Sequence, residues 1–140
     1  MPRSSRPCSV SEGLADTSVG IDWDDPAVVA ALPDMLAIST ITLAELTAGP
    51  YLARDPLEKA RRQARLQQVE ALFDPVDFDV TAARSFGQVV AATMVAGRSH
   101  RSRIADLLIA AVAHANKLPL YTRNPQDFVG LSALITVEAV

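Results

Sequence analysis

Three carboxylates stand out as candidate reactive groups because each interrupts or follows an apolar run. Asp16 follows the pair Leu14-Ala15, Glu45 has apolar neighbours on both sides, and Asp106 lies in an apolar helical segment. Carboxylate oxygens hold Mg²⁺ and related divalent ions, and ions held in this way can activate water for hydrolysis. Asp16, at the expected carboxyl end of a strand, is well placed for such an ion.

Each acid also has a purely structural interpretation. Asp16 suits a turn or the N-cap of a following helix. Thr42-x-x-Glu45 matches a capping box, in which the glutamate satisfies a backbone N–H. Asp106 could stabilise the positive end of a helix dipole, although it lies one residue beyond the capping-box position if Ser102 is the N-cap. These alternatives stay open at the level of sequence.

Other kinds of reactive site are missing from the sequence. The six glycines are isolated, so neither common phosphate-binding loop is present. His100, His114 and the single cysteine, Cys8, are too far apart along the chain for zinc-ligand spacing. No serine lies in a Gly-x-Ser-x-Gly elbow. The carboxylates therefore remain the strongest candidates.

Arginines surround one of these acids. Between positions 98 and 123 basic residues predominate and Asp106 is the only acid, whereas acids predominate before position 56. Arginines beside an acid cluster could hold the phosphates of a polyanion, and a solvated loop is the structural alternative. The candidates are Arg98, Arg101, Arg103 and Arg123. The nearby pair Asn124-Pro125 is typical of a turn.

The composition is that of one soluble globular domain. The chain has 140 residues, of which 49% are hydrophobic and 5% aromatic, and its net charge is -3. Residues 1–12 are rich in serine, proline and arginine and predict a flexible N-terminal arm, so we expect the folded domain over residues 13–140. No apolar run is typical of a secretory signal or a membrane span, which favours the cytoplasm. The mild acidity argues against a generally basic nucleic-acid-binding face.

Apolar runs alternate with helical periods along the rest of the chain. We expect helices that begin at the Asp55 N-cap, at a Thr81 N-cap with a stop at Gly97, and near Arg103. The last of these runs to Asn116 and carries the clearest apolar stripe. The expected strands are Leu14 to Asp16, Leu36 to Ser39, Val76 to Val80, Pro119 to Thr122 and Ala133 to Val137. This alternation predicts an α/β fold whose parallel sheet is covered on both faces.

Four motifs, taken together and in this order, resemble the PIN-domain ribonucleases and, within them, the VapC-type toxins. They are Leu-Ala-Asp16-Thr-Ser, Thr-Leu-Ala-Glu45-Leu, Arg-Ile-Ala-Asp106-Leu-Leu and Tyr-Thr-Arg-Asn124-Pro-Gln-Asp127-Phe. Each motif alone is weak, but four in register are specific. The resemblance covers the chain from Gly13 to Val137. It implies a three-layer α/β/α fold with a central parallel sheet of about five strands.

The resemblance also implies the site. Asp16, Glu45 and Asp106 would bind Mg²⁺ or Mn²⁺, and without metal such acids repel one another, so that some bind protons or splay apart. Many family members have a fourth acid after the fourth strand. This sequence has Asn124 there and Asp127 three residues later, and either side chain could contribute to the metal site. Thr17 or Ser18 would orient Asp16 or a water molecule.

The implied function is that of a type II toxin, a metal-dependent endoribonuclease that leaves 5′-phosphate and 3′-hydroxyl ends. The low aromatic content favours contact with RNA through phosphate and metal rather than base stacking. A VapB-type antitoxin would bind the toxin, with an arginine entering the acidic pocket and the segment Ala44 to Leu72 as docking surface. Relatives of this kind form homodimers and toxin–antitoxin hetero-oligomers. They contact DNA only through the antitoxin and do not contact membranes.

Two other functions compete with this hypothesis. A catalytically silent PIN domain would bind RNA or a protein partner without cleaving, and Asn124 motivates that alternative. A receiver-type signalling domain would share the α/β fold. It would need a phospho-accepting aspartate after a central strand and a Lys-Pro pair after the last one. Asp77 and Asp79 lie within or beside the third expected strand, and Lys117 precedes leucine, so the receiver pattern fits poorly.

Overall fold

The computed structural model describes residues 11–140, so most of the expected arm lies outside the described residues. Strand β1 (Glu12–Ala15) begins at Glu12, one residue before the expected start of the folded domain. Ser11 is also tied to the fold. Its backbone N–H donates to Asp34 Oδ2 over 3.1 Å, and its carbonyl accepts from the Met35 N–H over 2.9 Å. These bonds join the start of β1 to the start of the neighbouring strand.

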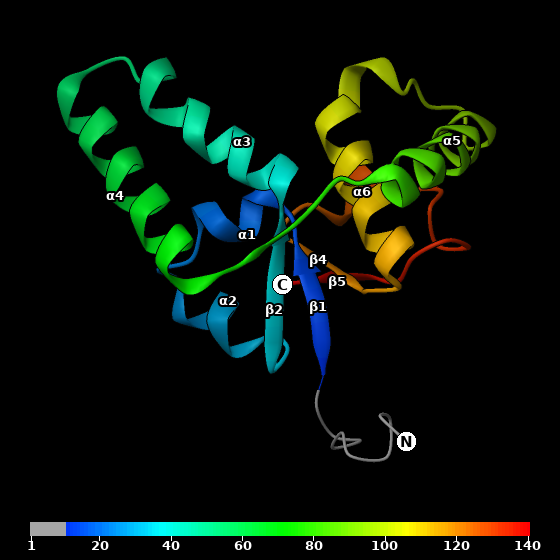
Figure 1. Ribbon diagram of the computed structural model, residues 1–140, viewed down its shortest axis with the longest axis horizontal. Helices are drawn as coiled ribbons and strands as arrows, with labels where there is room; N and C mark the ends of the chain where they lie inside the picture. The colour runs from blue at the N-terminus through cyan, green and yellow to red at the C-terminus, as the bar shows by residue number, and fades with distance from the viewer. Residues whose placement is uncertain (1–10) are drawn as a thin grey trace.

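Five parallel strands form the central sheet, in the order β3-β2-β1-β4-β5 (Figure 1). The other strands are β2 (Met35–Ser39), β3 (Pro75–Val76), β4 (Leu120–Thr122) and β5 (Val137–Ala139). The predicted α/β fold with a parallel sheet is therefore confirmed. The chain builds outward from β1 through β2 to β3, and then returns to the other side of β1 with β4. The order of the strands thus reverses at β1, and ligands of open α/β sheets bind at the carboxyl ends of the strands beside such a reversal.

Helices cover both faces of the sheet (Figure 1). They are α1 (Thr17–Ile21), α2 (Pro26–Ala30), α3 (Thr40–Ala48), α4 (Pro56–Leu72), α5 (Val80–Val95) and α6 (Ile104–Asn116). Short 3₁₀ turns are η2 (Gly49–Leu52), η3 (Arg101–Arg103) and η4 (Pro125–Phe128). No helix within residues 11–140 is both long and apolar enough to cross a membrane.

Two hydrophobic clusters lie on opposite faces of the sheet. Leu14 packs with buried residues of α5 and α6, whereas its neighbour Ala15 packs with buried residues of α1 to α4. Successive side chains of a strand point to opposite faces, so one strand contributes to both clusters. On α6, the side chains of Leu107 and Ile109 are almost completely buried. The sheet is therefore the middle layer of the three-layer fold.

Several predicted boundaries are wrong by a few residues. Only Pro75–Val76 pairs as β3, because Asp79 ends the extended segment and caps α5 by accepting from the Ala82 N–H over 2.9 Å. Thr81 is therefore inside the helix. The last strand begins at Val137 rather than Ala133.

The helix starts were predicted with mixed success. Asp55 caps α4 as predicted and accepts from the Glu58 N–H over 2.8 Å. Ser102 is not the N-cap of α6, because it lies in η3 and α6 starts after Arg103 without a side-chain cap. Asp106 is therefore in the first turn of a helix whose N-terminus has no side-chain cap.

Candidate active site

Asp16 lies at the junction between β1 and α1, and the local sequence explains its place. Its backbone is extended, with φ of -80° and ψ of 175°, and its carboxylate accepts the Ser18 N–H over 3.0 Å. Asp16 is therefore the N-cap of α1, as its structural interpretation proposed. It also lies at the carboxyl end of a central strand and is only 4% exposed. Asp16 can therefore cap α1 and also belong to the candidate site.

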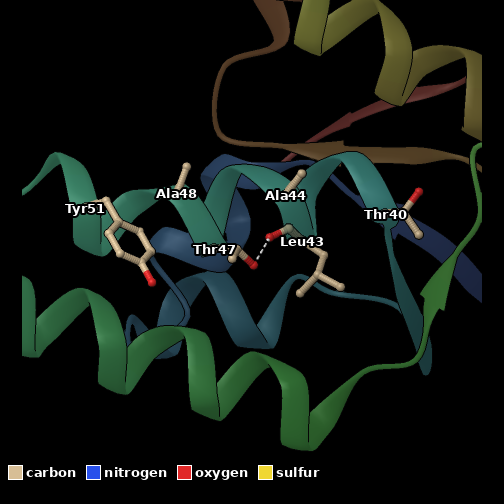
Figure 2. Close-up of a pocket in the computed structure, with 6 residues that line it drawn as sticks. All are labelled: Thr40, Leu43, Ala44, Thr47, Ala48 and Tyr51. Atoms are coloured by element: carbon tan, nitrogen blue, oxygen red, sulfur yellow. Dashed lines mark hydrogen bonds between the residues drawn. The ribbon is translucent and has the colours of Figure 1, made fainter.

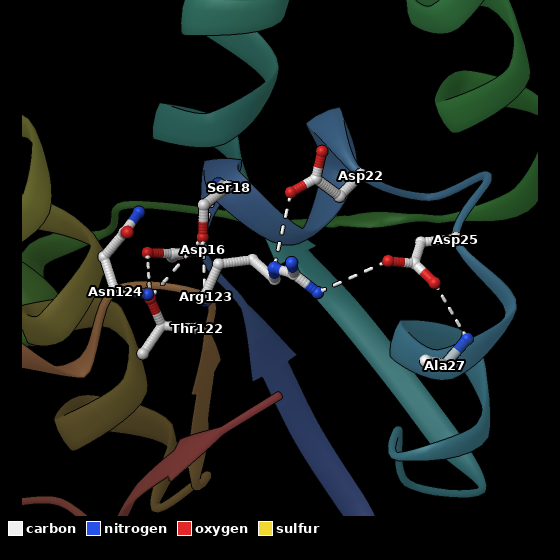
Figure 3. Close-up of polar contacts among 8 residues, drawn as sticks. All are labelled: Asp16, Ser18, Asp22, Asp25, Ala27, Thr122, Arg123 and Asn124. Carbon is white, nitrogen blue, oxygen red and sulfur yellow. Dashed lines mark hydrogen bonds and ion pairs between the residues drawn. The ribbon is translucent and has the colours of Figure 1, made fainter.

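Two hydroxyl groups fix the Asp16 carboxylate in position (Figure 3). Ser18 Oγ donates to Oδ1 over 2.5 Å, and Thr122 Oγ1 donates to Oδ2 over 2.7 Å. Each hydroxyl also accepts a backbone N–H from the loop after β4. The Arg123 N–H donates to Ser18 over 3.0 Å, and the Asn124 N–H donates to Thr122 over 2.9 Å. The loop after β4 therefore supports the carboxylate through both hydroxyls.

Sequence reasoning placed Ser18 beside Asp16 but missed Thr122 as a site residue. Thr122 is completely buried, and it reaches Asp16 because β1 and β4 are neighbours in the sheet. A hydroxyl at the end of a strand is a weak signal in sequence. It becomes informative only when the order of the strands is known.

Glu45 lies in the second turn of α3 and does not form a capping box. Ser39 is the N-cap of α3, since its hydroxyl accepts the Thr42 N–H over 3.1 Å, so Thr42 is already inside the helix. The Glu45 carboxylate instead accepts a short hydrogen bond from Thr17 Oγ1. Of the two residues predicted to orient Asp16, Ser18 donates to it, whereas Thr17 contacts Glu45. The reason is that Thr17 begins α1 and faces α3, whereas Ser18 faces the loop after β4.

Asp106 shows that the acids converge. The pKa of this half-buried carboxyl is raised from 3.8 to about 6, first by burial and then by the negative charges of Asp127, Asp16 and Glu45, in that order. Arg103 opposes the increase. Burial also raises the pKa of Asp16, while hydrogen bonds from Ser18 and Thr122 oppose that change. Four acids from separate elements therefore interact around Asp106.

The acid in the loop after β4, Asp127, is paired with an arginine. Asp127 Oδ1 and Arg103 Nη1 are 2.5 Å apart, and both side chains are partly buried. The Asn124 carbonyl accepts the Asp127 N–H over 3.0 Å, which closes the turn predicted for this segment. Asp127 is thus close enough to Asp106 to affect its pKa, but its charge is paired with Arg103.

The predicted phosphate-binding arginines are mostly engaged within the chain. Arg98 Nη1 donates to the Gln126 carbonyl over 2.6 Å, and Arg103 pairs with Asp127. Arg123 extends from the end of β4 toward Asp22, where Nε and Oδ2 are 3.3 Å apart, and also pairs with Asp25 (Figure 3). Arg101 is exposed in η3.

Other arginines, on α4, were not predicted as site residues. Arg61, Arg62 and Arg65 line a hollow of about 480 Å³ that Thr17 and Glu45 also line. Their closeness to Glu45 depends on the packing of α4 against α3.

The donor set suits a hard divalent cation, because the converging groups are carboxylates. Within residues 11–140, no three or more Asp, Glu, His or Cys side chains are arranged so that they could hold an ion as they lie. Asp16 directs both oxygens to hydroxyl groups, and Glu45 bonds to Thr17. These side chains would have to leave their hydroxyl partners to share one cation. The raised pKa of Asp106 agrees with the expected repulsion among the acids.

Comparison with protein families tests the resemblance that the motifs suggested. The family model of the PIN domain matches residues 14–130 of the chain. The chain belongs to the PIN domain family. This PIN domain is 37% identical to Ribonuclease VapC5 of Mycobacterium tuberculosis over 131 residues, which cover 91% of this chain and 93% of the relative. The predicted VapC-type membership is thus confirmed.

Solved structures of similar proteins agree with this assignment. The PIN domain matches the crystal structure of VapBC-5, a member of the VapBC family of toxin–antitoxin systems from Mycobacterium tuberculosis, with a TM-score of 0.78 and 35% identity. That match covers 93% of this chain and 98% of the other. A match to FitAcB from Neisseria gonorrhoeae has a TM-score of 0.72 and 29% identity, and covers 89% and 95% of the two chains. The predicted three-layer PIN-like fold is confirmed.

Proposed function

We propose that this PIN domain is the toxin of a type II toxin–antitoxin pair and hydrolyses RNA phosphodiester bonds as a Mg²⁺- or Mn²⁺-dependent endoribonuclease. The observation that carries the proposal is the position of Asp16, a buried carboxylate at the carboxyl end of β1, where the order of the strands reverses. The raised pKa of Asp106, to which burial and the charges of Asp127, Asp16 and Glu45 contribute, agrees with it. Carboxylates gathered at the carboxyl ends of parallel strands are suited to hold a divalent cation. The similarity to Ribonuclease VapC5 supports the choice of RNA as substrate.

Asp16, Glu45 and Asp106 are the proposed metal ligands. The bound cation would activate water and stabilise the charge on the phosphate during hydrolysis. Ser18 and Thr122 position Asp16, and Thr17 positions Glu45. These hydroxyls hold the carboxylates in place in the metal-free protein, and part of this hydrogen bonding would be replaced by contacts to the cation.

Asp127 and Asn124 have smaller proposed roles. Because Asp127 pairs with Arg103, its oxygens are partly neutralised and it is the weaker ligand. The Asn124 side chain could supply a neutral carbonyl oxygen, while its backbone N–H supports Thr122. The proposed site would therefore hold the cation with three charged ligands, fewer than a site in which a fourth acid is also free.

We also propose a VapB-type antitoxin as partner. The similarity to VapBC-5, a member of the VapBC family of toxin–antitoxin systems, supports this partner. The predicted docking segment, Ala44 to Leu72, forms part of a hollow of about 500 Å³ along α3, which is lined by uncharged residues from Thr40 to Tyr51 (Figure 2). Tyr51 at one end is 81% exposed. A largely apolar surface of this kind on α3, the helix that also carries Glu45, suits an amphipathic helix of the partner. The homodimer, contact with DNA through the antitoxin alone, and the cytoplasmic location stay predictions.

Cleavage of purified RNA tests the catalytic proposal. The protein is incubated with structured RNA in Mg²⁺, Mn²⁺ or EDTA, beside the variants Asp16→Asn and Asp106→Asn and the exposed-acid control Asp74→Asn. We expect cleavage in either metal, with 5′-phosphate ends, and its loss in EDTA and in both site variants but not in the control. Cleavage that persists in EDTA or in both folded site variants would contradict the assignment of these acids.

A second candidate is an RNA-binding domain that does not cleave. The observations that favour it are Asn124 at the position expected for an acid and the pairing of Asp127 with Arg103. Binding of RNA without scission in either metal would select this alternative.

A further inference from the structure

A hollow extends from the candidate active site toward α4. Its walls come from α1, α3, η2 and α4, and its volume is about 480 Å³. Thr17 and Glu45 line it together with three arginines of α4, namely Arg61, Arg62 and Arg65. A ligand in this hollow would therefore contact the acidic site and the arginines at the same time.

One of the three arginines has a structural role. Arg62 Nη1 donates to the Gly49 carbonyl over 2.8 Å, and Nη2 forms an ion pair with Glu58. These contacts connect α4 to η2 and hold that wall of the hollow. The guanidinium of Arg62 is thus already satisfied within the chain.

The other two arginines have no such partners. Within residues 11–140, neither Arg61 nor Arg65 forms a hydrogen bond or ion pair through its guanidinium. They are four residues apart on one helix, so their side chains lie on the same face, where like charges repel. An anion between them would relieve that repulsion, and guanidinium groups bind phosphate oxygens in a bidentate manner.

We propose that Arg61 and Arg65 bind a backbone phosphate of the RNA strand next to the phosphate that is cleaved. This inference rests on the proposed function, because it needs an RNA strand at the acidic site. The hollow is continuous from Glu45 to both arginines, so a strand held at the acids extends directly to them. Apolar side chains such as Leu46 and Leu52 also line it and offer contact to the sugar and base. Two unpaired positive charges favour a polyanion over an apolar peptide as the occupant.

RNA binding without cleavage tests this site. Fluorescence anisotropy of a labelled single-stranded RNA is measured in EDTA at several salt concentrations for the full chain and for Arg61→Gln, Arg65→Gln and the double variant. Arg84→Gln removes an exposed arginine of α5 and is the matched control. A double Arg→Lys variant at positions 61 and 65 keeps the charge but not the planar guanidinium. Thermal unfolding verifies that every variant is folded.

We expect the double Gln variant to bind RNA about tenfold more weakly or worse, because a charged hydrogen-bonded contact is lost. The slope of log affinity against log salt should fall by about 0.7 for the lost phosphate contact. The Lys variant should keep the wild-type slope, and Arg84→Gln should change neither quantity. All four results together would support the site.

Unchanged RNA affinity and salt slope in the double Gln variant would overturn the inference. Loss of binding to a VapB-type antitoxin with unchanged RNA binding would also overturn it, and would assign the arginines to the protein partner. Cleavage by the wild-type protein in Mg²⁺, measured separately, keeps the two proposals distinct. If the wild type cleaves RNA and the arginine variants behave like it, only this inference fails, whereas a wild type that neither binds nor cleaves RNA refutes both.

Discussion

Removal of the Asp106 charge should stabilise the metal-free protein at neutral pH. Burial and the charges of Asp127, Asp16 and Glu45 raise the pKa of Asp106 from 3.8 to about 6. Between these pH values the folded chain holds the proton more tightly than the unfolded chain does. The stability that this group contributes is therefore present at low pH and is lost as pH rises to about 6. Asn at position 106 does not ionise, so the variant does not lose this stability as the pH rises.

The size of this effect follows from the change in pKa. One pKa unit corresponds to about 1.4 kcal/mol, so the increase to about 6 sets an upper bound of about 3 kcal/mol. Asp106 is only half-buried, and water screens part of the repulsion. We expect the free energy of unfolding of Asp106→Asn, relative to the wild type, to increase by roughly 1–2 kcal/mol between pH 4 and pH 8.

Urea unfolding in EDTA at a series of pH values measures this difference. Asp74→Asn is the control, because Asp74 is exposed and lies just before β3, away from the acids. The pH dependence of the wild type and of the control should be the same. If the stability of Asp106→Asn relative to the wild type does not increase with pH, the acids do not repel one another as the structure indicates. The argument for a cation site at Asp106 would then fail as well.

Three further predictions concern metal, a buried hydroxyl and the backbone. Mg²⁺ or Mn²⁺ at 100 times its Kd should raise the free energy of unfolding by about 2.7 kcal/mol, and calorimetry should find no such increase for Asp16→Asn. Thr122→Val removes the hydroxyl that donates to Asp16, so it should lower stability by about 1–3 kcal/mol in urea unfolding and reduce RNA cleavage. Gly130→Ala should lower stability by about 1–3 kcal/mol, because φ is 93° and the new Cβ would lie 2.5 Å from Ala96 Cβ. Gly87→Ala, with nothing within 4 Å in the middle of α5, should instead raise stability by about 0.5–1 kcal/mol, and equal effects of the two glycine changes would contradict this reasoning.

Local patterns predicted the elements that depend on neighbours in the chain. The Asp55 cap of α4 was predicted because capping involves residues three positions apart. The boundary of β3 was not, because the run from Val76 to Val80 suits a strand, while Asp79 can also start a helix. Packing of α5 over the sheet selects the second possibility. Capping competes with strand formation at such boundaries, and sequence does not show which prevails.

The roles of the acids show a similar division. Asp16, Glu45 and Asp106 were recognised as candidates from their apolar surroundings and from the order of the motifs. Their interaction around Asp106 is a property of the structure, because they come from elements that are far apart in the chain. The same holds for Thr17, whose partner is Glu45 rather than its neighbour Asp16.

The sequence by itself determined the α/β class, the three longest helices and the candidate acids, since these depend on periodicity, capping and residue type over short distances. The tertiary structure alone decided which side chains meet. The strand order brings Thr122 beside Asp16, and the packing of α4 against α3 brings Arg61 and Arg65 toward Glu45. Contacts of this kind join distant segments, and their partners are chosen by burial of the whole core rather than by any local pattern.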